Sequence, residues 1–93
     1  MFNVNEYFDG NVKSLAFTSG NDNATIGVMA AGEYEFGTST IEHMTLISGE
    51  MSVKLPNEDS WRDIAINETF IVEADTSFNV KLACDSAYLC VYK

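Results

Sequence analysis

The chain has 93 residues, of which 46% are hydrophobic and 12% aromatic. This length suits a single domain covering residues 1–93, and the composition excludes a disordered chain. Fourteen acidic residues against five Lys and Arg give a net charge of −9, which argues against a basic surface for nucleic acid or anionic membranes.

Apolar residues recur with a period of two, which is typical of β-strands. Phe78, Val80 and Leu82 alternate strictly and are expected to share one face. Ser48-Gly49 is expected to form a tight hairpin. The expected strands, in chain order, are residues 12–17, 61–66, 69–72, 78–82 and 87–92. The expected turns and loops are Gly20–Asn23, Ser48-Gly49, Pro56–Ser60, Asn67-Glu68 and Asp85-Ser86.

No stretch of ten or more residues has the apolar spacing of an α-helix. Eight or nine short strands separated by turns predict an all-β sandwich or barrel. The pattern leaves jelly-roll, immunoglobulin-like and open-barrel topologies open.

The sequence leads to two further expectations, one about cellular location and one about the cysteines. The first six residues lack the basic and apolar regions of a signal peptide, and no apolar run approaches the roughly 18–20 residues of a membrane span, so we expect a cytoplasmic protein. Cys84 and Cys90, near the C-terminus, lack the spacing of a zinc site or a redox pair. Both are expected to be buried free thiols.

The single histidine, His43, excludes a histidine-rich metal site within one chain. Neighbours in a strand face opposite ways, so His43 is expected on the outer surface if Glu42 points into a barrel. Glu33, Glu35 and Glu42 could raise one another's pKa at a barrel mouth and supply a general acid. The alternative is that these carboxylates are solvated at a sheet edge. Trp61 is expected in the core.

Several segments, taken in order and spacing, resemble the small bacterial pyrimidine/purine nucleoside phosphorylase family. The resemblance extends from Asn5 to Tyr92 and rests on Asn5-Glu6-Tyr7-Phe8, Gly10, Val12-Lys13-Ser14, Gly27-Val28-Met29, Gly32-Glu33-Tyr34, Phe36, Glu42-x-Met44-Thr45-x-Ile47-Ser48-Gly49 and Tyr88-Leu89-Cys90-x-Tyr92. It implies a single-domain, cupin-like jelly-roll or double-stranded β-helix barrel, assembled as a homodimer. It also implies phosphorolysis of purine and pyrimidine nucleosides to free base and ribose 1-phosphate, with phosphate as co-substrate and no metal or other cofactor.

The sequence also lacks most of the ligands that a metal-binding cupin would need. Cupins that bind metal usually carry His-x-His, then Glu, then a later His. Glu42 stands where that Glu would, whereas the early histidines would fall near Phe36 and Thr38 and the late one near Phe78. Of these four metal ligands, only the glutamate is therefore present.

The resemblance also suggests roles for individual residues. Glu42 is expected to be the acid or the carboxylate that contacts the sugar, with Glu33 as a second catalytic carboxylate. Lys13 is expected to bind phosphate, assisted by Thr45. The five Lys and Arg residues are scattered along a chain of net charge −9, however, which is unusual for a protein that binds an anion. The other expected substrate-binding residues are Tyr34, Met44, Tyr88 and Tyr92.

The chain departs from the family in four places. Relatives tend to carry Pro-Gly at Glu73-Ala74, a histidine near Asn79, a glycine within Asn67–Thr69 and an arginine at Val91. The missing Pro-Gly pair and the missing arginine favour the alternative hypothesis, a non-catalytic cupin-like module that binds a small ligand or a partner, whereas the match over the rest of the chain favours the phosphorylase. A metal-dependent cupin enzyme is the third hypothesis.

Overall fold

The computed structural model describes residues 1–93 as ten strands and one three-residue 3-10 helix. The structure contains no helix of sufficient length and apolar character to span a membrane. The elements are β1 Val4–Tyr7, η1 Phe8–Gly10, β2 Val12–Ser19, β3 Asp22–Met29, β4 Gly32–Gly37, β5 Glu42–Ser48, β6 Met51–Lys54, β7 Arg62–Ile64, β8 Thr69–Val72, β9 Ser77–Leu82 and β10 Ser86–Tyr92. The all-β prediction is confirmed, with ten strands in place of the expected eight or nine.

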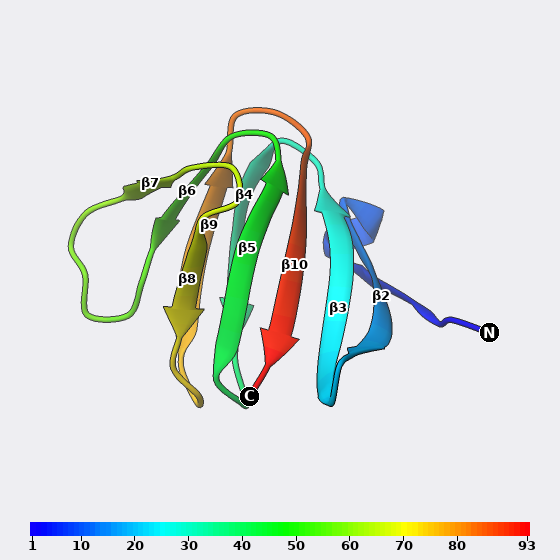
Figure 1. Cartoon of the computed structure of the whole chain (residues 1–93). Helices are drawn as coiled ribbons and strands as arrows, with labels where there is room; N and C mark the ends of the chain where they lie inside the picture. Colours follow the sequence, from blue (N-terminus) through cyan, green and yellow to red (C-terminus); the bar gives the residue numbers. More distant parts are fainter.

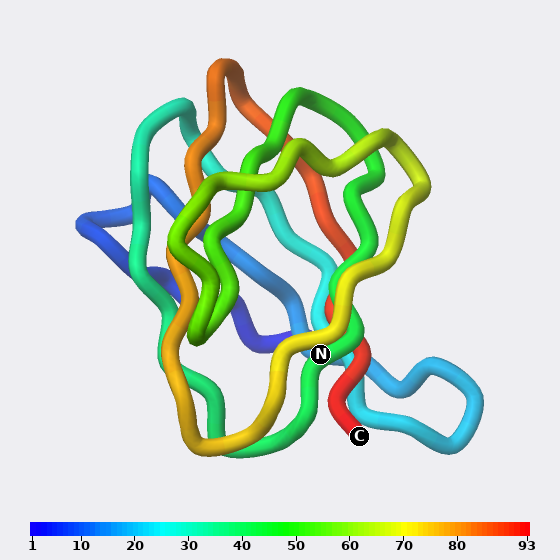
Figure 2. The backbone as a smooth tube through the Cα atoms, turned by 90° about the vertical axis from the view of Figure 1, so that its left-hand side faces the viewer, coloured from blue at the N-terminus to red at the C-terminus, as the bar shows by residue number.

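The strands form two antiparallel sheets. The larger has the order β1-β2-β3-β10-β5-β8, and the smaller has the order β4-β9-β6-β7. Figure 1 shows the larger sheet in front of β4 and β9. In Figure 2, turned by 90°, β4 and β9 lie on one side of the interior and β5 and β10 on the other.

Strand alternation builds one core between the sheets. Phe78, Val80 and Leu82 on β9 are only 2%, 0% and 3% exposed, which confirms the predicted shared face. Leu46 on β5 and Val12 on β2 are fully buried on the opposing sheet, in the same cluster of 14 buried apolar residues. Removing this apolar surface from water is the main stabilising contribution of the fold.

Ser48-Gly49 is not a hairpin, and that prediction is wrong. β5 pairs with β10 and β8, whereas β6 pairs with β9 and β7, so the chain passes from one sheet to the other here. Gly49 has φ +108°, a conformation that favours glycine. The Glu50 N–H donates to Ser86 Oγ at 3.3 Å, which fixes the crossing against the start of β10.

Three smaller expectations also need correction. The loop expected at Gly20–Asn23 is a two-residue turn, because β3 already begins at Asp22. Trp61 precedes the short β7 and lies outside the buried core, with the Lys81 ammonium 4.4 Å from its ring centroid. Both cysteines are free, but Cys84 is exposed in the β9–β10 turn and only Cys90 is buried.

Candidate active site

A cavity of about 410 Å³ lies between the two sheets. This is within the range of small-ligand sites, roughly 300–1,000 Å³. Apolar and hydroxyl-bearing side chains dominate its wall, and no Lys, Arg or His lines it. The lining residues are Tyr7, Phe8, Ser14, Met29, Glu35, Phe36, Gly37, Glu42, Met44, Phe78, Tyr88, Cys90 and Tyr92.

Glu42, the first residue of β5, is half-buried in this cavity. Burial raises the pKa of its carboxyl above the ordinary value of 4.5, because a charged carboxylate loses solvation there. The Cys90 thiol donates to Glu42 Oε1 at 3.5 Å, and this hydrogen bond partly opposes the rise in pKa. Glu42 is therefore a carboxyl that can hold a proton at a higher pH than a solvated glutamate.

Three groups on β10 surround Glu42. Burial raises the pKa of Tyr88 to about 12 and, together with the Glu42 charge, raises the pKa of the Cys90 thiol to about 12. Burial also raises the pKa of Tyr92, whose hydroxyl lies 3.0 Å from that of Thr25. All three side chains on β10 consequently remain neutral hydrogen-bonding groups near pH 7.

Aromatic rings form the wall toward the smaller sheet. Phe36 lies between Phe8 and Phe78, with ring centroids 5.5 and 5.8 Å away. These spacings are those of tilted and edge-to-face aromatic pairs. Tyr34 lies beside this wall, 4.9 Å from the Phe8 centroid, and donates its hydroxyl proton to the Ala30 carbonyl at 2.7 Å.

The structure brings together Glu42, Met44, Tyr88 and Tyr92 of the residues predicted from sequence. Tyr34 is in the aromatic cluster but does not line the cavity. The other three predicted site residues project from the opposite faces of their strands.

Lys13, Glu33 and Thr45 lie outside the cavity, which corrects the expected grouping. Lys13 is exposed between the buried Val12 and Ser14, and its ammonium lies 3.5 Å from Glu6. Glu33 is exposed on the outer side of β4, opposite Lys81 in the register. Thr45 shares a 2.6 Å hydrogen bond with Thr69 on the outer face of the larger sheet.

Sequence reasoning missed much of the cavity wall. The alternation of apolar residues could have identified Phe36 and Phe78, because each belongs to the set of side chains that its strand directs into the core. Ser14 is 4% exposed and accepts a hydrogen bond from the Asn5 amide at 3.5 Å, and it is a polar residue on the apolar side of β2. Tyr7 and Phe8 reach the cavity because positive φ values at Phe8 and Asp9 turn the chain there, which the sequence pattern did not reveal.

The donors of the cavity do not fit a metal centre. No group of three or more His, Cys, Asp or Glu side chains is arranged to hold an ion. Phe36 and Phe78 line the cavity together with Glu42, near the positions where the resemblance places the histidines of metal-binding cupins. Aromatic rings at these points supply stacking surface in place of metal ligands.

Gly27 on β3 makes room for Tyr88. A Cβ added there would lie 2.7 Å from the Tyr88 hydroxyl and 2.7 Å from the Lys13 carbonyl. Because one of these atoms is backbone, Gly27→Ala is expected to cost about 1–3 kcal/mol and to displace Tyr88. Thermal unfolding and the tyrosine ring signals in NMR spectra measure both effects. Gly37→Ala is the control, since its Cβ would meet only the Thr76 carbonyl at 3.9 Å, and equal effects in both variants would contradict this prediction.

The Cys90 thiol is expected to lower the pKa of the Glu42 carboxyl. Cys90→Ala removes the hydrogen bond to the carboxylate, so the pKa of Glu42 should rise further, whereas Cys90→Ser should keep it nearer the wild-type value. Carboxyl-carbon NMR titration measures this directly. Cys84→Ala, an exposed thiol, should leave the titration unchanged. A wild-type Glu42 titration in Cys90→Ala would show that the thiol has no such role.

Sequence comparison now places the chain among known proteins. The family model described as pyrimidine/purine nucleoside phosphorylase matches residues 2–92. The chain belongs to this family. A protein of that name from Pseudomonas syringae is 58% identical over 93 residues, covering all of both chains. Another from Alcanivorax borkumensis is 56% identical over 92 residues, covering 99% of this chain and 98% of the relative.

Solved structures agree on the fold. A Vibrio parahaemolyticus protein of unknown function has a TM-score of 0.95 and 40% identity, covering 100% of this chain and 99% of the other. A cupin-2 domain protein from Rhodospirillum rubrum has a TM-score of 0.75 and 11% identity, covering 98% of this chain and 69% of the other. The predicted cupin-like fold is confirmed.

Proposed function

We propose that this protein is a broad-specificity nucleoside phosphorylase, a glycosyltransferase of the pentosyl class. The observation that carries the proposal is the half-buried Glu42 carboxyl in an aromatic cavity, in a chain of this family. In the reaction a phosphate oxygen forms a bond to C1′ of the ribose while the bond from C1′ to the base nitrogen breaks. The electron pair of that bond leaves with the base, and the products are free base and ribose 1-phosphate.

Glu42 acts as the acid in this scheme. Its raised pKa supports a protonated fraction at higher pH than for a solvated glutamate, and that proton can pass to the departing base. As the proton moves to the base and the bond to C1′ breaks, the carboxylate that forms stabilises the positive charge developing on the sugar in the oxocarbenium-like transition state. The phosphate loses its proton as it bonds to C1′, and this proton restores the Glu42 carboxyl. In this scheme Glu42 alone is both the proton donor to the base and the carboxylate that contacts the sugar. Glu33, which lies on the outer face of β4, has neither role.

The cavity wall supports wide substrate choice. Phe36, Phe78 and Tyr88 present apolar ring surface, and Met44 adds a flexible apolar side chain. Every purine and pyrimidine has a face that stacks on an aromatic ring, whereas discrimination needs hydrogen-bonding groups aimed at base edges. Neutral aromatic walls therefore suit many nucleosides.

Phosphate is held by hydroxyl donors in this proposal. Ser14, Tyr7, Tyr88 and Tyr92 bring hydroxyl groups to the cavity, and no cation lines it. Lys13 lies on the opposite side of β2, so its expected phosphate role does not fit the geometry of one chain. Phosphate is the only co-substrate required, and no metal or other cofactor takes part. The family resemblance further predicts a cytoplasmic homodimer that binds neither nucleic acid nor membranes.

The test is an incubation with uridine or adenosine, with and without phosphate. We expect free base and ribose 1-phosphate in equal amounts, and only when phosphate is present. Base release without phosphate would indicate hydrolysis, and no base release from any nucleoside at high protein concentration would refute the proposal.

A non-catalytic binding module is the second candidate, and the absence of a cation from the cavity favours it. Two of the family departures do not strengthen it further. Asn79 and Val91 occupy outward phases of β9 and β10, so a histidine or arginine there would not enter the cavity from this backbone. This candidate predicts saturable nucleoside binding by calorimetry without phosphate-dependent turnover.

A further inference from the structure

One side of β4 is a free edge of the smaller sheet, because β9 is the only strand that pairs with it. The Thr38 N–H donates to the Thr76 carbonyl at 2.8 Å, one step beyond the last pair of the β4–β9 register. Hydrogen-bonded and non-hydrogen-bonded pairs alternate along an antiparallel ladder. Counting back from Thr38, the backbone N–H and C=O groups of Glu33, Glu35 and Gly37 therefore point away from β9, toward the free edge.

The other side of β9 follows the same alternation. The Ala83 N–H donates to the Glu50 carbonyl at 3.3 Å, one step beyond the β6–β9 register. The odd-numbered residues of β9 thus bond to β6, which leaves the even-numbered residues for β4. No loop or side chain accepts a hydrogen bond from the N–H groups of Glu35 and Gly37. These backbone groups are free to bind a ligand.

This part of the free edge borders the cavity. Glu35 and Gly37 both line it. Gly37 has no side chain, so its contribution to the lining is backbone. Alternation directs the Glu35 side chain, like that of Glu33, to the exposed side of β4, so the backbone of Glu35 also faces the cavity. The inward ring of Phe36, between them, lines the same space, and the free edge and an aromatic surface therefore meet at one place.

The free edge offers a hydrogen-bonding pattern that nucleobases share. An extended residue presents its N–H and its C=O on the same side, one donor beside one acceptor. Each nucleobase carries the complementary pair on the edge that it uses in base pairing, such as N3–H beside O4 in uracil or the amino group beside N1 in adenine. Proteins that bind unpaired bases commonly combine hydrogen bonds to this edge with stacking on an aromatic side chain.

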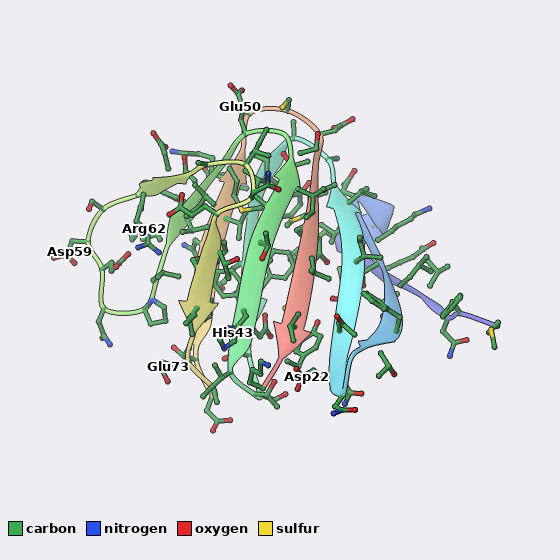
Figure 3. The ribbon with its side chains drawn as sticks, viewed as in Figure 1. Asp22, His43, Glu50, Asp59, Arg62 and Glu73 are labelled. Atoms are coloured by element: carbon green, nitrogen blue, oxygen red, sulfur yellow. The ribbon has the colours of Figure 1, made fainter.

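The charges near the free edge favour a neutral ligand over phosphate. Each free N–H of β4 lies beside a carbonyl of the same residue, and Glu42 adds a carboxyl to the cavity. Arg62, labelled in Figure 3, lies on β7 at the opposite edge of the smaller sheet. A cavity of about 410 Å³ also suits a small ligand rather than a peptide strand. A nucleobase fits these conditions better than an anion or a peptide.

We propose that the free edge of β4 binds the base-pairing edge of the nucleobase through the backbone of Glu35 and Gly37. This inference rests on the nucleoside ligand of the function proposed above, but it does not require turnover. Backbone groups match a pattern that purines and pyrimidines have in common. Broad substrate choice then has a second physical basis besides stacking, because the base is held without a side chain that selects one base.

Calorimetric titration of the wild type without phosphate tests the proposal with uridine, 3-methyluridine and 5-methyluridine. The methyl group of 3-methyluridine replaces the N3 proton, whereas 5-methyluridine carries an equal methyl group and keeps that proton. We expect 3-methyluridine to bind about 10–100-fold more weakly than uridine, because a backbone acceptor loses its donor. 5-Methyluridine should bind about as tightly as uridine. Equal affinity of all three, or equal losses for both methylated nucleosides, would overturn the proposal.

Proline variants test the donors of the protein. Proline lacks an N–H and is tolerated on edge strands where that N–H faces away from the neighbouring strand. Glu35→Pro or Gly37→Pro should weaken uridine binding about 10-fold. Glu33→Pro is the matched control, because it also places proline at the free edge and removes a carboxylate, but lies outside the cavity. Circular dichroism monitors folding, and the methylated nucleosides decide the matter if a variant unfolds.

The outcomes separate this inference from the proposed reaction. Phosphorolysis with no discrimination between 3-methyluridine and 5-methyluridine would overturn the binding mode and leave the phosphorylase standing. Discrimination in binding without any turnover would support the binding mode and refute the phosphorylase. A Glu33→Pro variant that loses as much affinity as the other two would overturn the role of the free edge. So would a Glu35→Pro variant that loses affinity for inorganic phosphate and keeps its affinity for uridine.

Discussion

Replacing Glu42 with glutamine should lower phosphorolysis by about 10²–10⁴-fold, the usual contribution of a general acid, while the fold is retained. Glutamine keeps the shape of the side chain and loses the proton. The wild-type rate should fall as pH rises through the raised pKa of Glu42, and this limb should be absent in Glu42→Gln. Steady-state rates measured across pH provide the readout.

The same substitution should make the protein slightly more stable near pH 7. The folded pKa of Glu42 lies above its unfolded value, so the folded state binds more protons in the interval between them. Stability is therefore lost as pH rises through that interval, and a neutral glutamine removes the loss. Glu33→Gln on the exposed side of β4 should change neither property. Lower activity in Glu33→Gln, with wild-type activity in Glu42→Gln, would reverse the assignment.

Gly49→Ala should be the most destabilising of the glycine substitutions. An added Cβ would overlap Ser86 Oγ and lie 2.6 Å from Ser86 Cβ and 2.8 Å from Ser86 Cα. The φ of +108° adds strain for any L-residue. Combining strain and overlap, we expect a loss of about 3–5 kcal/mol, a large effect for one residue. Chemical denaturation measures it.

Gly20→Ala separates strain from overlap. Gly20 has φ +62° in the β2–β3 turn, and nothing lies within 4 Å of the added Cβ. Its cost should be only about 1–2 kcal/mol, from the left-handed conformation alone. If Gly49→Ala costs no more than Gly20→Ala, the tight crossing between β5 and β6 is not a structural requirement.

Period-two alternation predicted the strands that bury one face. Phe78, Val80 and Leu82 follow this pattern because β9 lies against the core on one side and water on the other. Alternation failed at Ser48-Gly49, because a tight turn and a crossing between sheets use similar residues. Which strands pair is decided by contacts far apart in the sequence, such as those of β10 with β3 and β5.

The candidate site was partly predictable for the same reason. Glu42, Tyr88 and Tyr92 lie on inward phases of their strands, as their segments suggested. Lys13 lies outside the cavity, on the other side of β2, and the family segment that contains it does not give the side of the strand that each residue faces. The places of Tyr7 and Phe8 depend on a local left-handed turn at Phe8 and Asp9, where non-glycine residues adopt an uncommon conformation.

A crystal structure with a bound nucleoside, grown without phosphate, would show directly whether the cavity is the nucleoside site. We expect a nucleoside between the two sheets, with its base against Phe36 or Phe78 and a nitrogen or oxygen atom of the base within hydrogen-bonding distance of the Glu42 carboxyl. A nucleoside bound only on an outer face, or a Glu42 side chain turned into bulk water with the cavity closed, would contradict it.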